Sequence, residues 1–134
     1  MYSQHVRGAS AYRQTSVQSS SPLELVVLLY DGALRHLVAA REAIDRQDLI
    51  TRREALSKAL AIVTELQSTL NLEEGGAIAQ QLEGLYTYMT GRLVDATARK
   101  DVKALPEVEN LLRSLRDAWA QIAAGEPATA GARP

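Results

Sequence analysis

The residues of this chain best suited to proton or phosphoryl chemistry are its two histidines, His5 and His36. Neither belongs to a Glu-x-x-His motif, which supplies ligands to the di-iron sites of ferritin-like bundles. The chain has no cysteine and no glycine-rich phosphate-binding loop. The sequence therefore predicts no catalytic residue, no bound metal and no cofactor, and we expect a protein that is not an enzyme.

His36 leaves one alternative, a histidine phosphotransfer module, which would suit a helical bundle of this size. Such a module needs a cation near the phosphoryl group to stabilise its charge. One turn after His36 lie Ala39 and Ala40, and the first cation that follows is Arg41. We therefore interpret His36 as a polar surface residue and keep phosphotransfer as the weaker alternative.

The acidic pairs Glu73–Glu74 and Glu107–Glu109 are the remaining charged candidates. They fall where loops and helix N-termini favour negative charge. We expect them to be solvated or to cap helices rather than to act as catalytic carboxylates.

Composition and charge narrow the class of protein. The 134 residues suffice for one domain with its own core, and the formal net charge of −1 gives no large basic field for nucleic acid or an anionic membrane. No apolar run approaches the roughly 18 residues that span a bilayer. Residues 1–13 lack the apolar core of a secretory signal. We expect a cytoplasmic protein of the cytosol, with no nucleic-acid partner and no direct membrane insertion.

The chain divides into an arm, a helical region and a tail. Residues 1–20 are polar and predict a flexible N-terminal arm with a possible short helix. Residues 124–134 contain glycine, proline and small residues and predict a disordered tail. Residues 21–123 contain four helical segments, at about 22–46, 48–70, 77–99 and 105–123. Because the loops are short, the sequence predicts an all-α fold, an antiparallel up-down-up-down four-helix bundle with a mobile arm.

One apolar stripe on each helix predicts the core. The stripes are Leu23, Val26, Tyr30, Ala33, Leu34, Leu37 and Ile44 on the first helix; Ala55, Leu56, Ala59, Ile62, Val63, Leu66 and Leu70 on the second; Ile78, Leu82, Leu85, Tyr86, Met89, Leu93 and Ala96 on the third; and Leu105, Val108, Leu112, Leu115, Trp119 and Ile122 on the fourth.

The start of the first helix carries more apolar residues than one stripe can use. Ser21 and Glu24 form a capping box there, followed by an unbroken apolar run at 25–30. Outside the core stripe remain Leu25, Leu28, Leu29 and Gly32. Either the broad core and the N-terminal arm cover these residues, or they form a groove for a partner segment. The helical wheel leaves both alternatives open.

Several sequence blocks, taken in order, give the chain a family resemblance. They are residues 11–17 (AYRQTSV), 21–25 (SPLEL), 28–34 (LLYDGAL), 66–71 (LQSTLN), 85–89 (LYTYM) with Arg92 and Leu93, 107–109 (EVE) and 115–119 (LRDAW). Their order and spacing, from about residue 9 to residue 121, resemble the FliS family of flagellar secretion chaperones. Gly75–Gly76 and the C-terminal tail have no place in that pattern.

The resemblance implies a non-enzymatic chaperone that binds the disordered C-terminal segment of flagellin in the cytosol. Such a chaperone prevents premature polymerisation and supports export through the flagellar type III apparatus. The resemblance also implies contact with the cytoplasmic domain of the export gate. The N-terminal arm is expected to pack over part of the chaperone's flagellin-binding surface and to move when flagellin binds.

These implications suggest roles for single residues. We expect Leu25, Leu28, Leu29 and Gly32 to line the groove, in which an amphipathic segment would lay its apolar side chains. Tyr12 and Val17 are expected to cover or dock, and Tyr88, off the stripe of its helix, to add a surface contact. Tyr30, Tyr86 and Trp119 are expected in the core.

The alternative function is a generic helical adaptor that binds another amphipathic segment or itself. In that case the surplus apolar face would form a homodimer interface.

Overall fold

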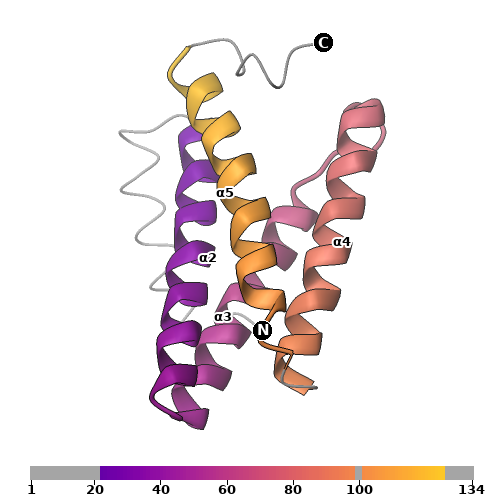
Figure 1. Ribbon diagram of the computed structural model, residues 1–134. Helices are drawn as coiled ribbons and strands as arrows, with labels where there is room; N and C mark the ends of the chain where they lie inside the picture. Colours follow the sequence, from indigo (N-terminus) through magenta and orange to yellow (C-terminus); the bar gives the residue numbers. More distant parts are fainter. Residues whose placement is uncertain (1–21, 99–100, 126–134) are drawn as a thin grey trace, which may run out of the picture.

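A computed structural model of the chain describes residues 22–98 and 101–125. It contains helices α2 (Pro22–Asp45), α3 (Leu49–Ser68), α4 (Gly76–Ala98) and α5 (Ala104–Ala123) (Figure 1). The prediction of an all-α fold is confirmed. The predicted arm of residues 1–20, the predicted helix cap Ser21 and the tail from residue 126 lie outside the described residues.

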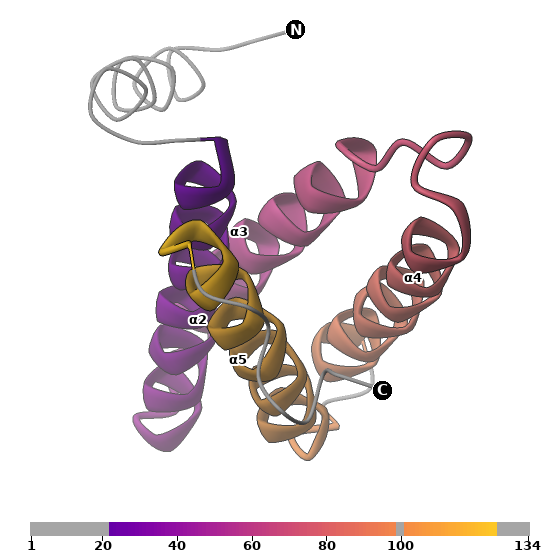
Figure 2. The same cartoon turned by 90° about the horizontal axis from the view of Figure 1, so that it is seen from above.

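The four helices follow one another around the bundle in chain order. Helix α2 packs against α3 and α5, and α4 packs against the same two helices from the other side. Successive helices run in opposite directions, as Figures 1 and 2 show. The starts of α2 and α4 and the end of α5 therefore share one end of the bundle.

Two short turns set the helix boundaries. Asp48 caps α3, where its side chain accepts hydrogen bonds from the backbone N–H of Thr51 at 3.1 Å and its hydroxyl at 2.6 Å. At the other turn, a side chain on Gly75 would lie 2.5 Å from the Cβ of Ala79 and 2.6 Å from the carbonyl oxygen of Asn71. Gly76 follows with φ of +58°. The glycine pair thus permits the tight entry into α4.

The core is apolar along most of the bundle. Its largest fully buried side chains are Tyr30, Leu37, Leu56, Leu66, Met89, Leu93, Leu105, Leu112, Val63 and Val108. All ten belong to the predicted stripes, because the apolar periodicity of each helix already marks the side that faces its neighbours.

Three aromatic side chains join α2, α4 and α5 inside the core. The hydroxyls of Tyr30 and Tyr86 form a short hydrogen bond, and the Trp119 indole Nε1 donates to the Tyr30 oxygen at 3.2 Å. Burial raises the pKa of both tyrosine hydroxyls. Tyr30 and Tyr86 are buried as predicted, whereas Trp119 packs on the core from a partly exposed position.

Three residues of the predicted stripes are not in the core. The first is Leu23, which is half-buried at the start of α2 and is not among the side chains packed on the core. Ile78, near the start of α4, is 68% exposed, and Ile122, near the end of α5, is 39% exposed. Figures 1 and 2 show the reason for the two isoleucines, because the start of α4 stands apart from the C-terminal half of α5. The stripes of α4 and α5 therefore continue past the region where a neighbouring helix covers them.

Glu109 contradicts the expectation of a solvated or capping acid. Its side chain is 4% exposed, and Arg41 of α2 contacts both carboxylate oxygens, Nε at 2.7 Å and Nη2 at 3.1 Å. A buried carboxylate requires such a partner because isolated burial of charge is costly. The Arg41–Glu109 pair thus links the C-terminal half of α2 to the N-terminal half of α5.

Candidate partner-binding site

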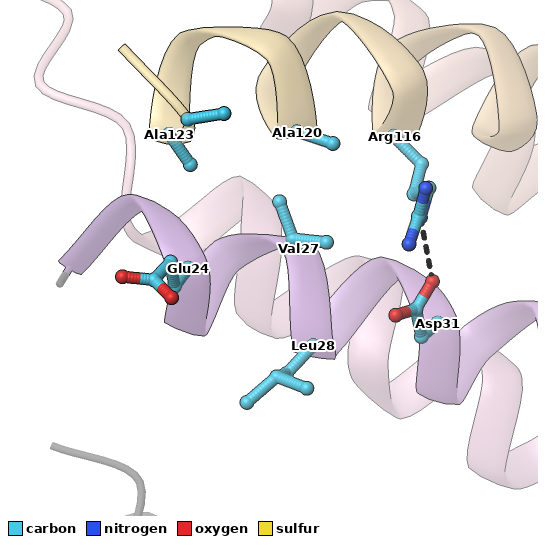
Figure 3. Close-up of a pocket in the computed structure, with 8 residues that line it drawn as sticks. Glu24, Val27, Leu28, Asp31, Arg116, Ala120 and Ala123 are labelled. Atoms are coloured by element: carbon cyan, nitrogen blue, oxygen red, sulfur yellow. Dashed lines mark hydrogen bonds and ion pairs between the residues drawn. The ribbon is translucent and has the colours of Figure 1, made fainter. Parts of the chain in front are cut away.

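A hollow that involves one of the predicted site residues, Leu28, lies between α2 and α5. We call this hollow the α2–α5 groove; its volume is about 340 Å³. It is lined by Glu24, Val27, Leu28, Asp31, Arg116, Ala120, Ala123 and Ala124. Figure 3 shows Val27 pointing toward α5 and Leu28 on the other side of α2. The wall opposite α2 has short side chains, because it consists largely of Ala120 and Ala123 of α5 and Ala124, which directly follows the helix.

An ion pair bridges the α2–α5 groove. Arg116 Nε lies 2.8 Å from Asp31 Oδ1, and Arg116 Nη1 lies 3.5 Å from Asp117 Oδ1 (Figure 3 shows the first contact). The hydrogen bond to Asp31, followed by the neighbouring negative charge, raises the pKa of the Arg116 guanidinium. The groove therefore combines an apolar stretch with a fixed charged pair one helical turn further along α2.

The four predicted groove residues share one broad face of α2, with Leu28 at the edge beside the α2–α5 groove. Leu28 lines the α2–α5 groove. Leu25, Leu29 and Gly32 follow one another at spacings of four and three, and Leu28 stands three positions after Leu25 and four before Gly32. That face turns to α3, because a Cβ on buried Gly32 would lie 3.3 Å from Ile62 Cδ1.

The four predicted groove residues differ in how deeply they are buried. Leu29 packs against the core, and Leu25 and Leu28 are half-buried. Gly32 permits close packing of α2 on α3, because it has no side chain to press against Ile62. A partner contact by any of the four stays a prediction.

A second hollow, of about 350 Å³, continues this face along α2. It is lined by His36, Ser57, Lys58, Ala61 and Ile62. Lys58 of α3 thus brings a cation to the surroundings of His36 that the spacing along α2 alone did not reveal.

Tyr88 lies on α4, away from both hollows. Its ring is 48% exposed, and its hydroxyl donates to Glu107 Oε2 at 2.7 Å. Arg92 contacts the other oxygen of Glu107 at 2.6 Å and also pairs with Asp95 and Asp101. The Arg92 hydrogen bond, then that of Tyr88, lowers the pKa of Glu107. Tyr88 is therefore exposed, as expected of a surface contact, but fixed to α5.

The other predicted contacts, Tyr12 and Val17, lie outside the described residues. Sequence reasoning missed Val27, Asp31 and Arg116. Val27 belongs to the apolar run at 25–30 but was assigned to neither stripe, and Asp31 and Arg116 stand inside blocks used only for the resemblance. Pairing them requires the antiparallel register of α2 and α5, which no local pattern supplies.

Within residues 22–98 and 101–125, no group of three or more His, Cys, Asp or Glu side chains is placed to hold a metal ion. None of the helices found there has the length and apolar character required to cross a membrane.

Comparison with known proteins now places the chain. A family model described as flagellar protein FliS matches residues 5–126. The chain belongs to the FliS family. The match covers α2 to α5 together with most of the preceding segment, so it includes the α2–α5 groove and the aromatic contact in the core.

Curated relatives agree with this FliS assignment. The chain is 44% identical over 120 residues to the flagellar secretion chaperone FliS of Salmonella typhimurium, covering 86% of this chain and 89% of the relative. It is 38% identical over 112 residues to the FliS of Bacillus subtilis, at 84% and 83% coverage. It is 33% identical over 118 residues to the flagellar secretion chaperone FliSB of Pseudomonas aeruginosa, at 85% and 94% coverage.

Proposed function

We propose that this chain is a flagellar secretion chaperone that binds the C-terminal segment of flagellin in the cytosol. By occupying that segment it prevents premature polymerisation and supports export through the flagellar type III apparatus. The observation that carries the proposal is the FliS match over residues 5–126, with relatives named as flagellar secretion chaperones over most of their length.

The α2–α5 groove is the binding surface that we assign to this function. Val27 and Leu28 provide apolar contact on α2, and the alanines of α5 leave room for a helix to approach closely. An amphipathic segment would bind in helix-in-groove mode. Because ordering a disordered segment costs part of the interaction free energy, contacts beyond this groove are needed. The face of Leu25 and the surface at Tyr88 are proposed to supply them.

We further propose that Tyr12 and Val17 hold the N-terminal arm on the flagellin-binding surface of the chaperone when no flagellin is bound. The chain continues from the described residues into this arm at Pro22, two residues before Glu24 at the edge of the groove. An arm that competes with flagellin lowers the apparent affinity by the fraction of molecules in which the groove is covered. Deletion of residues 1–17 is then expected to tighten flagellin binding.

The proposal includes one further partner, and one alternative function remains beside it. The loaded chaperone is proposed to contact the cytoplasmic domain of the export gate. The alternative function, a helical adaptor that self-associates, uses the same apolar surface as a homodimer interface. Light scattering over a range of protein concentrations distinguishes the flagellin chaperone from the self-associating adaptor. The average mass of the adaptor rises with concentration, while that of the chaperone does not.

The experiment that tests the function is a calorimetric titration with a synthetic peptide covering the C-terminal segment of flagellin from the same organism. We expect binding to the full chain, and binding about tenfold or more weaker to Leu28→Glu, because a carboxylate would replace a buried apolar contact. Ile50→Glu is the matched control, since Ile50 is 73% exposed at the start of α3, near the opposite end of the bundle. Absence of binding at tens of micromolar would exclude the proposed function.

A further inference from the structure

The ion pair in the α2–α5 groove leaves part of its carboxylate unused. Among the described residues, Arg116 is the partner of Asp31, and it approaches Oδ1 alone, through Nε at 2.8 Å. A carboxylate offers about four acceptor positions on two oxygens. The side chain of Asp31 is 30% exposed, so a second donor can reach Oδ2 from the groove without displacing Arg116.

The surroundings of Asp31 favour a cation over a neutral donor. At this end of the groove, the Asp31 carboxylate faces one guanidinium, that of Arg116. Asp117, which also approaches Arg116, adds a further negative charge beside it. A hydrogen bond from a charged donor to a carboxylate is about twice as strong as one between neutral groups. The polar end of the groove is therefore complementary to a lysine or arginine.

The apolar residues fix where that cation must stand in a ligand. Val27 and Leu28 precede Asp31 by four and three positions, which is one helical turn, or about 5.4 Å along α2. A helix lying in the groove brings its own side chains into register with them at the same interval. An apolar residue three or four positions from a basic residue would satisfy both ends of the groove.

We propose that Asp31 is a specificity residue that selects a helical ligand carrying a lysine or arginine three or four positions from an apolar anchor. The inference rests on the proposed function, because it names the feature of the bound flagellin segment that the groove recognises. Arg116 holds the Asp31 carboxylate in place, and the cation of the ligand binds the second oxygen. Binding through this contact weakens as ionic strength rises.

The test is a double-mutant cycle between the full-length chain and the flagellin peptide. Asp31→Asn keeps the size of the side chain and removes its charge, and each basic residue of the peptide is replaced in turn by glutamine. We expect Asp31→Asn to weaken binding of the original peptide about tenfold or more, the effect of losing one charge-assisted hydrogen bond. At one basic position of the peptide, the glutamine substitution should then weaken binding to the Asp31→Asn chain little further.

Glu42→Gln is the matched control, because Glu42 is an exposed carboxylate on α2 outside the groove. The exchange Asp31→Arg with Arg116→Asp retains an ion pair between the helices and reverses the charge offered to the ligand. It should bind the original peptide poorly and recover affinity when the selected basic residue of the peptide becomes glutamate.

The outcomes separate the inference from the function. If the wild-type chain does not bind the peptide at all, the proposed function fails. If it binds, but no basic-to-glutamine substitution weakens binding to the wild-type chain, the inference is overturned while the function stands. The same conclusion follows if Asp31→Asn binds every peptide as the wild-type chain does.

Discussion

The aromatic contact in the core predicts an unequal effect of two similar substitutions, Tyr30→Phe and Tyr86→Phe. The Trp119 N–H can only donate, so the Tyr30 oxygen accepts from it and the Tyr30 hydroxyl is free to donate to Tyr86. Tyr30 therefore serves two partners, whereas Tyr86 serves one.

The magnitudes follow from which groups lose a partner. Tyr86→Phe leaves the Tyr30 proton without an acceptor in a fully buried position, which costs about 1–2 kcal/mol of unfolding free energy. Tyr30→Phe leaves both the buried Tyr86 hydroxyl and the Trp119 N–H without a partner, and costs about 2–4 kcal/mol. The indole lies on the partly exposed side, so water reduces its share.

The assay is urea unfolding followed by far-ultraviolet circular dichroism at neutral pH for both variants and the double variant. Tyr30→Phe should have the lower midpoint at an unchanged denaturant slope. The double variant should lose less stability than the sum of the two single losses, with a coupling of about 0.5–3 kcal/mol. A Tyr86→Phe variant as unstable as Tyr30→Phe, or strictly additive losses, would refute this account of the contact.

Three further predictions concern the packing and charges of the bundle. The free energy of unfolding should fall above about pH 10, by up to about 1.4 kcal/mol per pH unit for each buried tyrosine. The reason is that tyrosines of the unfolded chain ionise there, while burial raises the pKa of Tyr30 and Tyr86 in the folded protein. Circular dichroism across the alkaline transition should show a shallower loss of stability with pH in Tyr86→Phe. Gly32→Ala should change the urea midpoint little, since the nearest atom, Ile62 Cδ1, is the flexible end of a side chain. Gly32→Leu should lower the free energy of unfolding by about 1–3 kcal/mol through overpacking. Equal midpoints for the two variants would place Gly32 away from α3. Arg41→Ala should cost about 3 kcal/mol in thermal or urea unfolding by leaving the buried Glu109 carboxylate unpaired, and a loss of only a few tenths would mean that the pair is solvated.

The architecture was predictable from local patterns. Apolar periodicity fixed the core positions of α2 to α5, and the polar Asp48 marked the start of α3, because capping and amphipathicity act within a few residues. The exceptions, Leu23, Ile78 and Ile122, lie at one end of the bundle. There the pattern continues although the neighbouring helix has moved away, a property of helix arrangement that one helix does not encode.

The candidate site was predictable only in part. The excess of apolar residues at 25–30 drew attention to the N-terminal end of α2, and Leu28 lines the α2–α5 groove there. The opposite wall was missed because Asp31 and Arg116 are separated by 85 positions, and Arg41 and Glu109 by 68. Such pairs depend on the register of two antiparallel helices, which the packing of the whole bundle decides.

Site-specific photocrosslinking of the full chain with flagellin tests the central claim most directly. A photoreactive phenylalanine analogue is placed at position 28, at position 120 across the groove, or at position 50 as the control. The proposed function predicts crosslinks from positions 28 and 120 to the C-terminal segment of flagellin, and none with flagellin truncated before that segment. Crosslinks from position 50 alone, or equal crosslinking of truncated flagellin, would contradict the assignment of the α2–α5 groove as the flagellin-binding surface.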